Sequence, residues 1–171
     1  MRVSNQLLKR IRLCLRREDG GALAELAILV PFLVIMLAAV SELGRFFQQY
    51  TTLAKATRTA SRYLSNHKLD ATELGRARSL VVCGKLACAD ADPHLLPGLT
   101  AGNVCIESTG SPKVTSVTVR IPRTNSDCTG ADAAVPYTFS PIFKVDALLN
   151  NSSLSLALPL APSTTMYYMI D

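Results

Sequence analysis

Residues 20–40 read GGALAELAILVPFLVIMLAAV, and this stretch decides how the whole chain is organised. From residue 22 onward it holds one charged residue, Glu25, and one proline, Pro31, among Ala, Leu, Ile, Val, Met and Phe. An α-helix rises about 1.5 Å per residue, so a run of this length matches a hydrocarbon layer of about 30 Å. The stretch therefore predicts a transmembrane helix, to which we assign residues 21–42.

The segment before this helix is basic. Residues 1–20 contain six Arg and Lys residues against two acidic residues, a net charge of +4. Residues 21–171 contain twelve basic and eleven acidic residues, and they contribute only +1 to the total of +5. Positive charge beside one end of a membrane span holds that end in the cytoplasm. We therefore assign residues 1–20 to a cytoplasmic leader. Nucleic-acid binding is not expected, because it needs a basic face on the folded part.

Glu25 needs a reason to lie in an apolar helix, because a carboxylate at mid-bilayer costs at least about 2.5 kcal/mol. It stands five residues after Gly20, at the end of the basic leader. A basic leader, a glycine and then an apolar helix with an early glutamate form the arrangement of a peptidase processing site. The alternative is a signal anchor that is never cleaved and keeps an interfacial glutamate.

The residues around this arrangement resemble the TadE/TadF-like family of tight-adherence (Tad/Flp) pilus proteins. Four segments carry the resemblance: residues 17–27, REDGGALAELA, residues 29–33, LVPFL, residues 42–45, ELGR, and residues 56–63, ATRTASRY. The resemblance implies cleavage by a prepilin peptidase between Gly20 and Gly21, which makes Glu25 the fifth mature residue. Leu26 departs from the family pattern, in which Phe or Tyr commonly follows the glutamate.

The resemblance also implies a function: a minor pilin or pseudopilin that helps to assemble adhesive pili. The expected location is the bacterial inner membrane, with the C-terminal domain in the periplasm. The expected partners are the prepilin peptidase, other pilins and pseudopilins, the inner-membrane assembly machinery and the lipid bilayer. After cleavage, the new amine of Gly21 is expected to pair with Glu25 of a neighbouring subunit and set the axial register. A place in the pilus shaft, at its tip or in a priming complex stays open.

Two other classes of function compete with this one. The first is an uncleaved single-pass membrane protein whose outer domain binds a partner or a ligand. The second is an enzyme, for which the sequence offers little, because it has no serine nucleophile elbow, phosphate-binding loop or HExxH motif. We therefore assign no catalytic residue and expect no cofactor.

The apolar helix is expected to continue beyond the membrane as an amphipathic helix to about residue 66. Apolar and small residues recur there every three or four positions, which is typical of one buried helix face. They are Leu43, Phe46, Phe47, Tyr50, Leu53, Ala54, Thr57, Ala60, Ser61 and Leu64. A second, short helix is expected after Asp70, an N-cap residue with Glu73 three positions on as in a capping box, and it should end near Gly84.

The C-terminal part changes to the two-residue period that is typical of strands. Apolar residues alternate with other residues at 104–107, 116–121 and 153–158, and a further strand is expected at 137–143. We expect a small antiparallel sheet that packs on the two helices. The predicted fold is therefore α+β and pilin-like, and residues 43–171 form its periplasmic domain.

The expected outer domain contains four cysteines, Cys83, Cys88, Cys105 and Cys128. An even number of cysteines in an exported domain predicts disulfide bonds. Four cysteines allow three pairings, of which Cys83–Cys88 with Cys105–Cys128 is the most economical. The alternative is a metal site at Cys83, Cys88 and His94, but this spacing is not that of a zinc ribbon, so we expect no metal.

Overall fold

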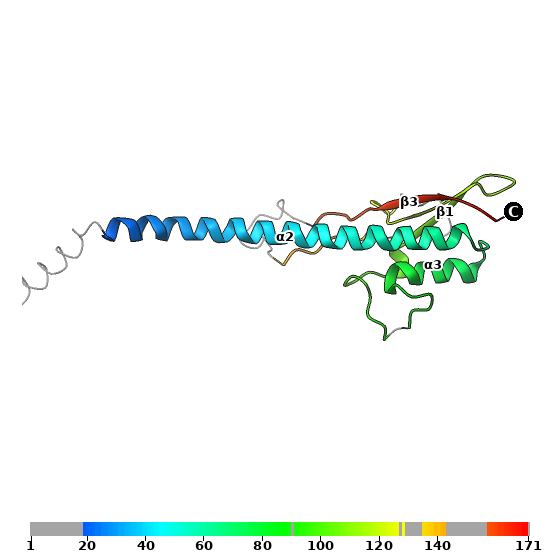
Figure 1. The fold of residues 1–171 in the computed structure, drawn as a ribbon, viewed down its shortest axis with the longest axis horizontal. Helices are drawn as coiled ribbons and strands as arrows, with labels where there is room; N and C mark the ends of the chain where they lie inside the picture. Colours follow the sequence, from blue (N-terminus) through cyan, green and yellow to red (C-terminus); the bar gives the residue numbers. More distant parts are fainter. Residues whose placement is uncertain (1–18, 90, 127, 129–134, 143–156, 171) are drawn as a thin grey trace, which may run out of the picture. The chain divides into compact units, whose positions relative to one another are not determined.

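The computed structural model describes residues 19–89, 91–126, 128, 135–142 and 157–170, with side chains from residue 21 onward. Its elements are α2 (Asp19–Ser65), α3 (Ala71–Cys83), the 3-10 helix η1 (Ala101–Asn103), β1 (Cys105–Thr109), β2 (Ser116–Arg120) and β3 (Ser163–Tyr167), as Figure 1 shows. The chain divides into two compact units, Met1–Leu43 and Gly44–Asp171. Two helices and an antiparallel sheet confirm the prediction of an α+β fold.

Helix α2 is 47 residues long, which agrees with the predicted helix from residue 22 to residue 66. Pro31 lies inside it and does not end it. In the first unit its large apolar side chains are exposed, among them Ile28 at 77% and Leu37 at 72%. By length and composition α2 is the one helix in the described part of the chain that is able to cross a membrane. A helix that is apolar on all sides needs apolar surroundings, because water would otherwise meet every face.

In the second unit, the C-terminal part of α2 lies between α3 and the sheet (Figure 1). The predicted apolar stripe supplies much of the core, since Leu53, Ala60 and Leu64 are almost fully buried. The stripe is wrong at three positions, because Leu43 and Phe47 are each 66% exposed and Tyr50 is 40% exposed. The aromatic position nearest the core is taken by Phe46, whose ring meets that of Phe139 edge to face at 5.5 Å. The continuous buried face of α2 therefore begins at Leu53, and Phe46 is the one of the three preceding aromatic residues that packs on another ring in the described part of the chain.

Helix α3 begins and ends where its cap residues predict. The side chain of Asp70 accepts a hydrogen bond from the main-chain N–H of Glu73 at 2.8 Å, which satisfies one of the open donors of the first turn. Gly84 ends the helix in the left-handed conformation, φ 72°, which favours glycine. Between the caps, Ala77 and Val81 are fully buried, and they hold α3 against the core.

The sheet has the strand order β1-β2-β3, and both neighbouring pairs are antiparallel. In β2 the buried residues Val117 and Val119 alternate with half-exposed polar residues, so one face of the sheet packs into the core. The first two strands confirm the two-residue pattern that predicted them at 104–107 and 116–121.

The third strand differs from the prediction. A strand was expected at 137–143, of which residue 143 lies outside the described residues. Within 137–142 the pairing is an isolated bridge between Thr138 and Pro159. Tyr137 and Phe139 are nevertheless buried, so their alternation reflects core packing without a strand. The predicted strand at 153–158 lies mostly outside the described residues. The third strand of the sheet is instead β3, whose sequence STTMY has no apolar alternation.

Candidate functional site

The predicted processing and register residues lie on one part of α2. Gly20 and Gly21 are both helical, and a side chain added at Gly21 would meet nothing within 4 Å. The Glu25 side chain is exposed, as are the apolar side chains around it. Gly21 and Glu25 are four residues apart, so they share one helix face about 6 Å apart along the axis. The Gly20–Gly21 peptide bond and the Glu25 carboxylate are therefore neighbours on an exposed helix.

A second acidic residue of α2, Glu42, differs from Glu25 in its surroundings. Only 6% of Glu42 is exposed, whereas Leu43 next to it is 66% exposed. Burial of a carboxylate is costly unless it has partners, and Glu42 has such a partner. In the sequence, Glu42 stood out only as part of the segment ELGR that carries the family resemblance. Its place in the short motif at residues 42–45, at the end of a long apolar run, was the signal that could have singled it out.

A polar cluster fastens α2 to α3. The Tyr63 hydroxyl donates a hydrogen bond to Glu73 Oε2, and Arg76 Nη1 lies 2.7 Å from Glu73 Oε1. The hydrogen bond to Glu73, followed by burial, raises the pKa of Tyr63, and the hydrogen bond with Tyr63 raises the pKa of Arg76. The Tyr63 ring also stacks on His67, with 4.0 Å between ring centroids. Glu73 therefore joins the helices with its side chain instead of completing the expected capping box.

The four cysteines of the second unit form two disulfides in the structure. Cys83 is joined to Cys88 across 5.9 Å between Cα atoms, and Cys105 to Cys128 across 6.1 Å. Both Cα separations lie in the range that a disulfide spans. This is the pairing that the sequence analysis favoured among the three. The first bridge closes the end of α3, and the second ties the start of β1 to the segment after β2.

The residues of the alternative metal site also lie together. The sulfur atoms of Cys83 and Cys88 and a ring nitrogen of His94 are all within 4.8 Å of one another. In this arrangement the two sulfur atoms are bonded to each other, so neither offers the thiolate that a zinc ion binds. The proximity therefore follows from the disulfide and from the loop that returns to the end of α3, where the Leu95 N–H donates to the Val82 carbonyl at 2.7 Å.

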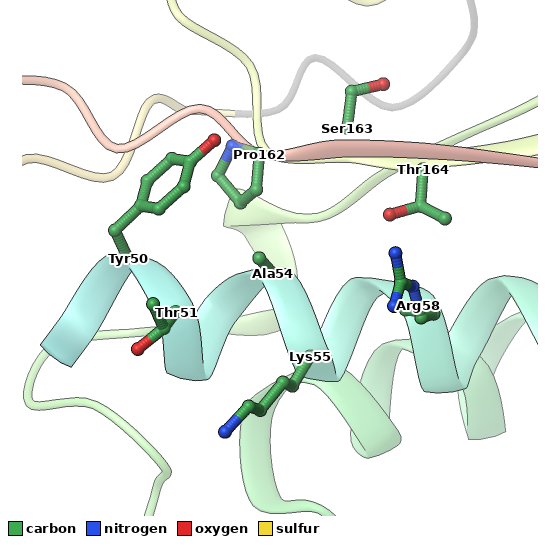
Figure 2. A pocket seen from close by; sticks show the side chains of 8 residues that line it. All are labelled: Tyr50, Thr51, Ala54, Lys55, Arg58, Pro162, Ser163 and Thr164. Carbon is green, nitrogen blue, oxygen red and sulfur yellow. The ribbon is translucent and has the colours of Figure 1, made fainter. Parts of the chain in front are cut away.

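A groove of about 300 Å³ runs between α2 and the start of β3 (Figure 2). Eight residues line it: Tyr50, Thr51, Ala54, Lys55 and Arg58 of α2, with Pro162, Ser163 and Thr164. Figure 2 shows Arg58 extending toward the strand beside Thr164, while the Tyr50 ring lies against Pro162 and Lys55 extends away from the strand. No sequence pattern predicted this groove, because none predicted β3.

These features define a class of protein: a long helix fit for a membrane, continued into a disulfide-bonded α+β unit. The family of TadE-like proteins matches residues 20–62, which run from Gly20 into the buried part of α2. No curated protein and no solved structure matches the chain. The resemblance read from the sequence is thereby confirmed over this segment: residues 20–62 are similar to TadE-like proteins.

Proposed function

We propose that this protein is a minor pilin or pseudopilin: a structural subunit for the assembly of adhesive Tad/Flp-type pili. The observation that carries the proposal is the match of residues 20–62 to the TadE-like family. This segment holds the early glutamate, Glu25, inside an exposed apolar helix. The basic leader, residues 1–20, keeps the N-terminus in the cytoplasm, and residues 43–171 form a periplasmic domain.

Processing by a prepilin peptidase between Gly20 and Gly21 is part of the proposal. Each glycine weakens a helix by about 1 kcal/mol relative to alanine, so this pair makes local unwinding into a protease site easy. Cleavage removes the leader charge that opposes extraction from the membrane. It also creates the Gly21 amine, which pairs with Glu25 of a neighbouring subunit and offsets the cost of a carboxylate in lipid.

The experiment that tests this function is N-terminal sequencing of the protein extracted from membranes of a host with its own prepilin peptidase. Gly21 is expected as the first residue. Gly20→Leu should leave the full-length precursor, because the site needs a small residue before the cut. Gly44→Leu is the matched control, since it adds the same side chain to an open position of the same helix, and it should be processed normally. A Gly20→Leu protein that is still shortened by the leader would place the site elsewhere.

The second candidate function is an uncleaved membrane protein whose second unit binds a partner. It is favoured by the groove beside β3, a hollow lined by Lys55 and Arg58 at which a partner could bind. The same sequencing experiment separates the two functions, because an intact N-terminus on the protein from its final location excludes the pilin role.

A further inference from the structure

Strand β3 is an end strand of the sheet, and its outer edge pairs with no strand among the described residues. Just past the strand, the Met169 N–H donates to the Ser65 carbonyl of α2 at 3.0 Å. Just beyond the ends of the β2–β3 ladder, Ile121 N–H donates to the Pro162 carbonyl at 3.0 Å and Tyr168 N–H to the Thr115 carbonyl at 2.9 Å. The main-chain N–H and C=O groups of the even-numbered residues of β3 therefore point toward β2. In an antiparallel ladder the alternate residues point their N–H and C=O groups the other way. The N–H and C=O groups of Ser163, Thr165 and Tyr167 consequently point away from β2, to the outer edge of the sheet. No strand of the described part of the chain pairs with them, and we call this the open edge.

A row of basic side chains runs along α2 beside this edge. Lys55, Arg58 and Arg62 follow each other at intervals of three and four residues, so they lie on one helix face. All three are exposed, and none forms an ion pair with the residues that the structure describes. We call these three residues the basic row.

The basic row and the open edge belong to one surface. On the inner side of β3, the Ser61 hydroxyl donates to the Thr164 carbonyl at 3.1 Å, and the Thr57 and Thr164 hydroxyls are 3.4 Å apart. These contacts hold the strand along α2. The groove shown in Figure 2 lies between α2 and the start of β3. Tyr167 adds an aromatic side chain that is 81% exposed, a residue type enriched where proteins bind each other.

We propose that this surface binds an extended, acidic segment of a partner protein. The segment adds a strand to the edge of β3, where its main chain pairs with the open N–H and C=O groups. Its carboxylates face Arg58, which extends toward the strand, while Lys55 at the groove and Arg62 one turn further along α2 add positive charge to the same surface. No acidic group in the described part of the chain neutralises these three charges. The inference concerns the second unit alone and goes beyond the proposed role in pilus assembly.

Two other occupants fit the surface less well. An anionic lipid headgroup would satisfy the basic row, but it has no main chain to pair with the strand edge. A second copy joined β3 to β3 would bring two basic rows together, and β3 itself, STTMY, contains no acidic residue to neutralise them. The acidic strand of another protein satisfies both features at once.

The test measures binding of fluorescein-labelled peptides to the full chain in nonionic detergent by fluorescence anisotropy. The probes are (Thr-Glu)₅ and its neutral counterpart (Thr-Gln)₅. We expect the acidic peptide to bind at least roughly tenfold more tightly at low salt, with the preference falling as salt is added. The variant Lys55→Glu/Arg58→Glu should lose at least roughly tenfold in affinity for the acidic peptide.

The strand edge is tested by Thr165→Pro, which removes an outward N–H and leaves the main-chain bonds to β2 in place. Both Thr165→Pro and its control Thr165→Val lose the hydroxyl that lies 2.8 Å from that of Thr118 in β2, so the two variants differ in the N–H and the proline ring. This variant should also lose affinity, whereas Thr165→Val, which keeps the N–H, should not. Lys68→Glu is the charge control, because Lys68 is exposed and lies outside the basic row.

Three results would overturn the proposal. The first is failure of the acidic peptide to bind, or equal binding of the two peptides. The second is binding of anionic phospholipid vesicles that depends on the basic row, without peptide binding, which assigns the row to a lipid surface. The third is self-association that Lys55→Glu/Arg58→Glu abolishes, which assigns the edge to a second copy.

Discussion

Glu25 is a carboxylate in an exposed apolar helix, and its removal has opposite effects on the lone subunit and on the assembly. In lipid the charge costs at least about 2.5 kcal/mol at mid-bilayer and less near an edge. Glu25→Ala removes this cost, so membrane insertion and abundance should hold or improve. It also removes the proposed partner of the Gly21 amine, so crosslinking to other pilus subunits and piliation should fail. Membrane fractionation, crosslinking and electron microscopy measure these outcomes.

Glu25→Gln separates charge from size and should fail to assemble in the same way. Normal assembly of both variants with intact cleavage would show that Glu25 does not set the register. A block of cleavage in either variant would move the role of Glu25 to recognition by the peptidase.

Gly110 follows β1 and holds a conformation that side chains disfavour, φ 117°. A Cβ there would approach the main-chain nitrogen of Thr115 to 2.7 Å, and this N–H donates the bond to the Thr109 carbonyl that closes the turn. Gly110→Ala should therefore lower the free energy of unfolding by about 1–3 kcal/mol. Urea unfolding of the detergent-solubilised protein, followed by circular dichroism, measures the change.

Gly75→Ala is the matched control for Gly110. Gly75 lies inside α3, is exposed, and has open space where its Cβ would stand. The same substitution there should raise stability by about 0.5–1 kcal/mol, because alanine is the better helix former. Equal effects of the two substitutions would contradict the described turn.

Helix α3 depends on its N-cap. Asp70→Ala removes the acceptor of the Glu73 N–H, and we expect a loss of about 1 kcal/mol in the free energy of unfolding. Asp70→Asn keeps an acceptor at the same place and should cost much less. If Asp70→Asn is as harmful as Asp70→Ala, the charge near the helix N-terminus matters more than the hydrogen bond.

The two disulfides close loops of different length, and this difference predicts their effects. The paired cysteines are 23 positions apart for Cys105–Cys128 and 5 for Cys83–Cys88. Because the entropy removed from the unfolded chain grows with loop length, double substitution to serine should cost about 3 kcal/mol for the longer loop and about 2 kcal/mol for the shorter one. Chemical unfolding of the two double variants measures both values.

Exported protein should contain both bridges throughout. Thiol labelling of the denatured, unreduced mature protein should find no free cysteine, because the proposed cleavage also removes Cys14. Reduction before labelling is the control and should reveal four thiols. Labelling of all four cysteines without reduction would contradict both the bridges and the periplasmic location.

The sequence by itself determined the two helices and their limits. Residues 22–66 keep a helical apolar period with no strong breaker after Pro31, so α2 was predicted to within a few residues. The limits of α3 were predicted because Asp70 and Gly84 act on main-chain groups within their own turn. The family segment was also readable, since Gly20, Glu25 and the motifs around them are close in sequence.

Only the tertiary structure decided β3, the partners of Glu73 and the disulfide pairing. β3 is an edge strand that turns only Thr164 and Met166 toward the core, so it needs no apolar alternation, and its partner β2 lies more than forty residues away in sequence. Glu73 bonds to Tyr63 because α3 folds back on α2, which no local pattern encodes. The cysteine pairing follows from the same folding, because a disulfide requires two Cα atoms within reach, and spacing along the chain does not set that distance.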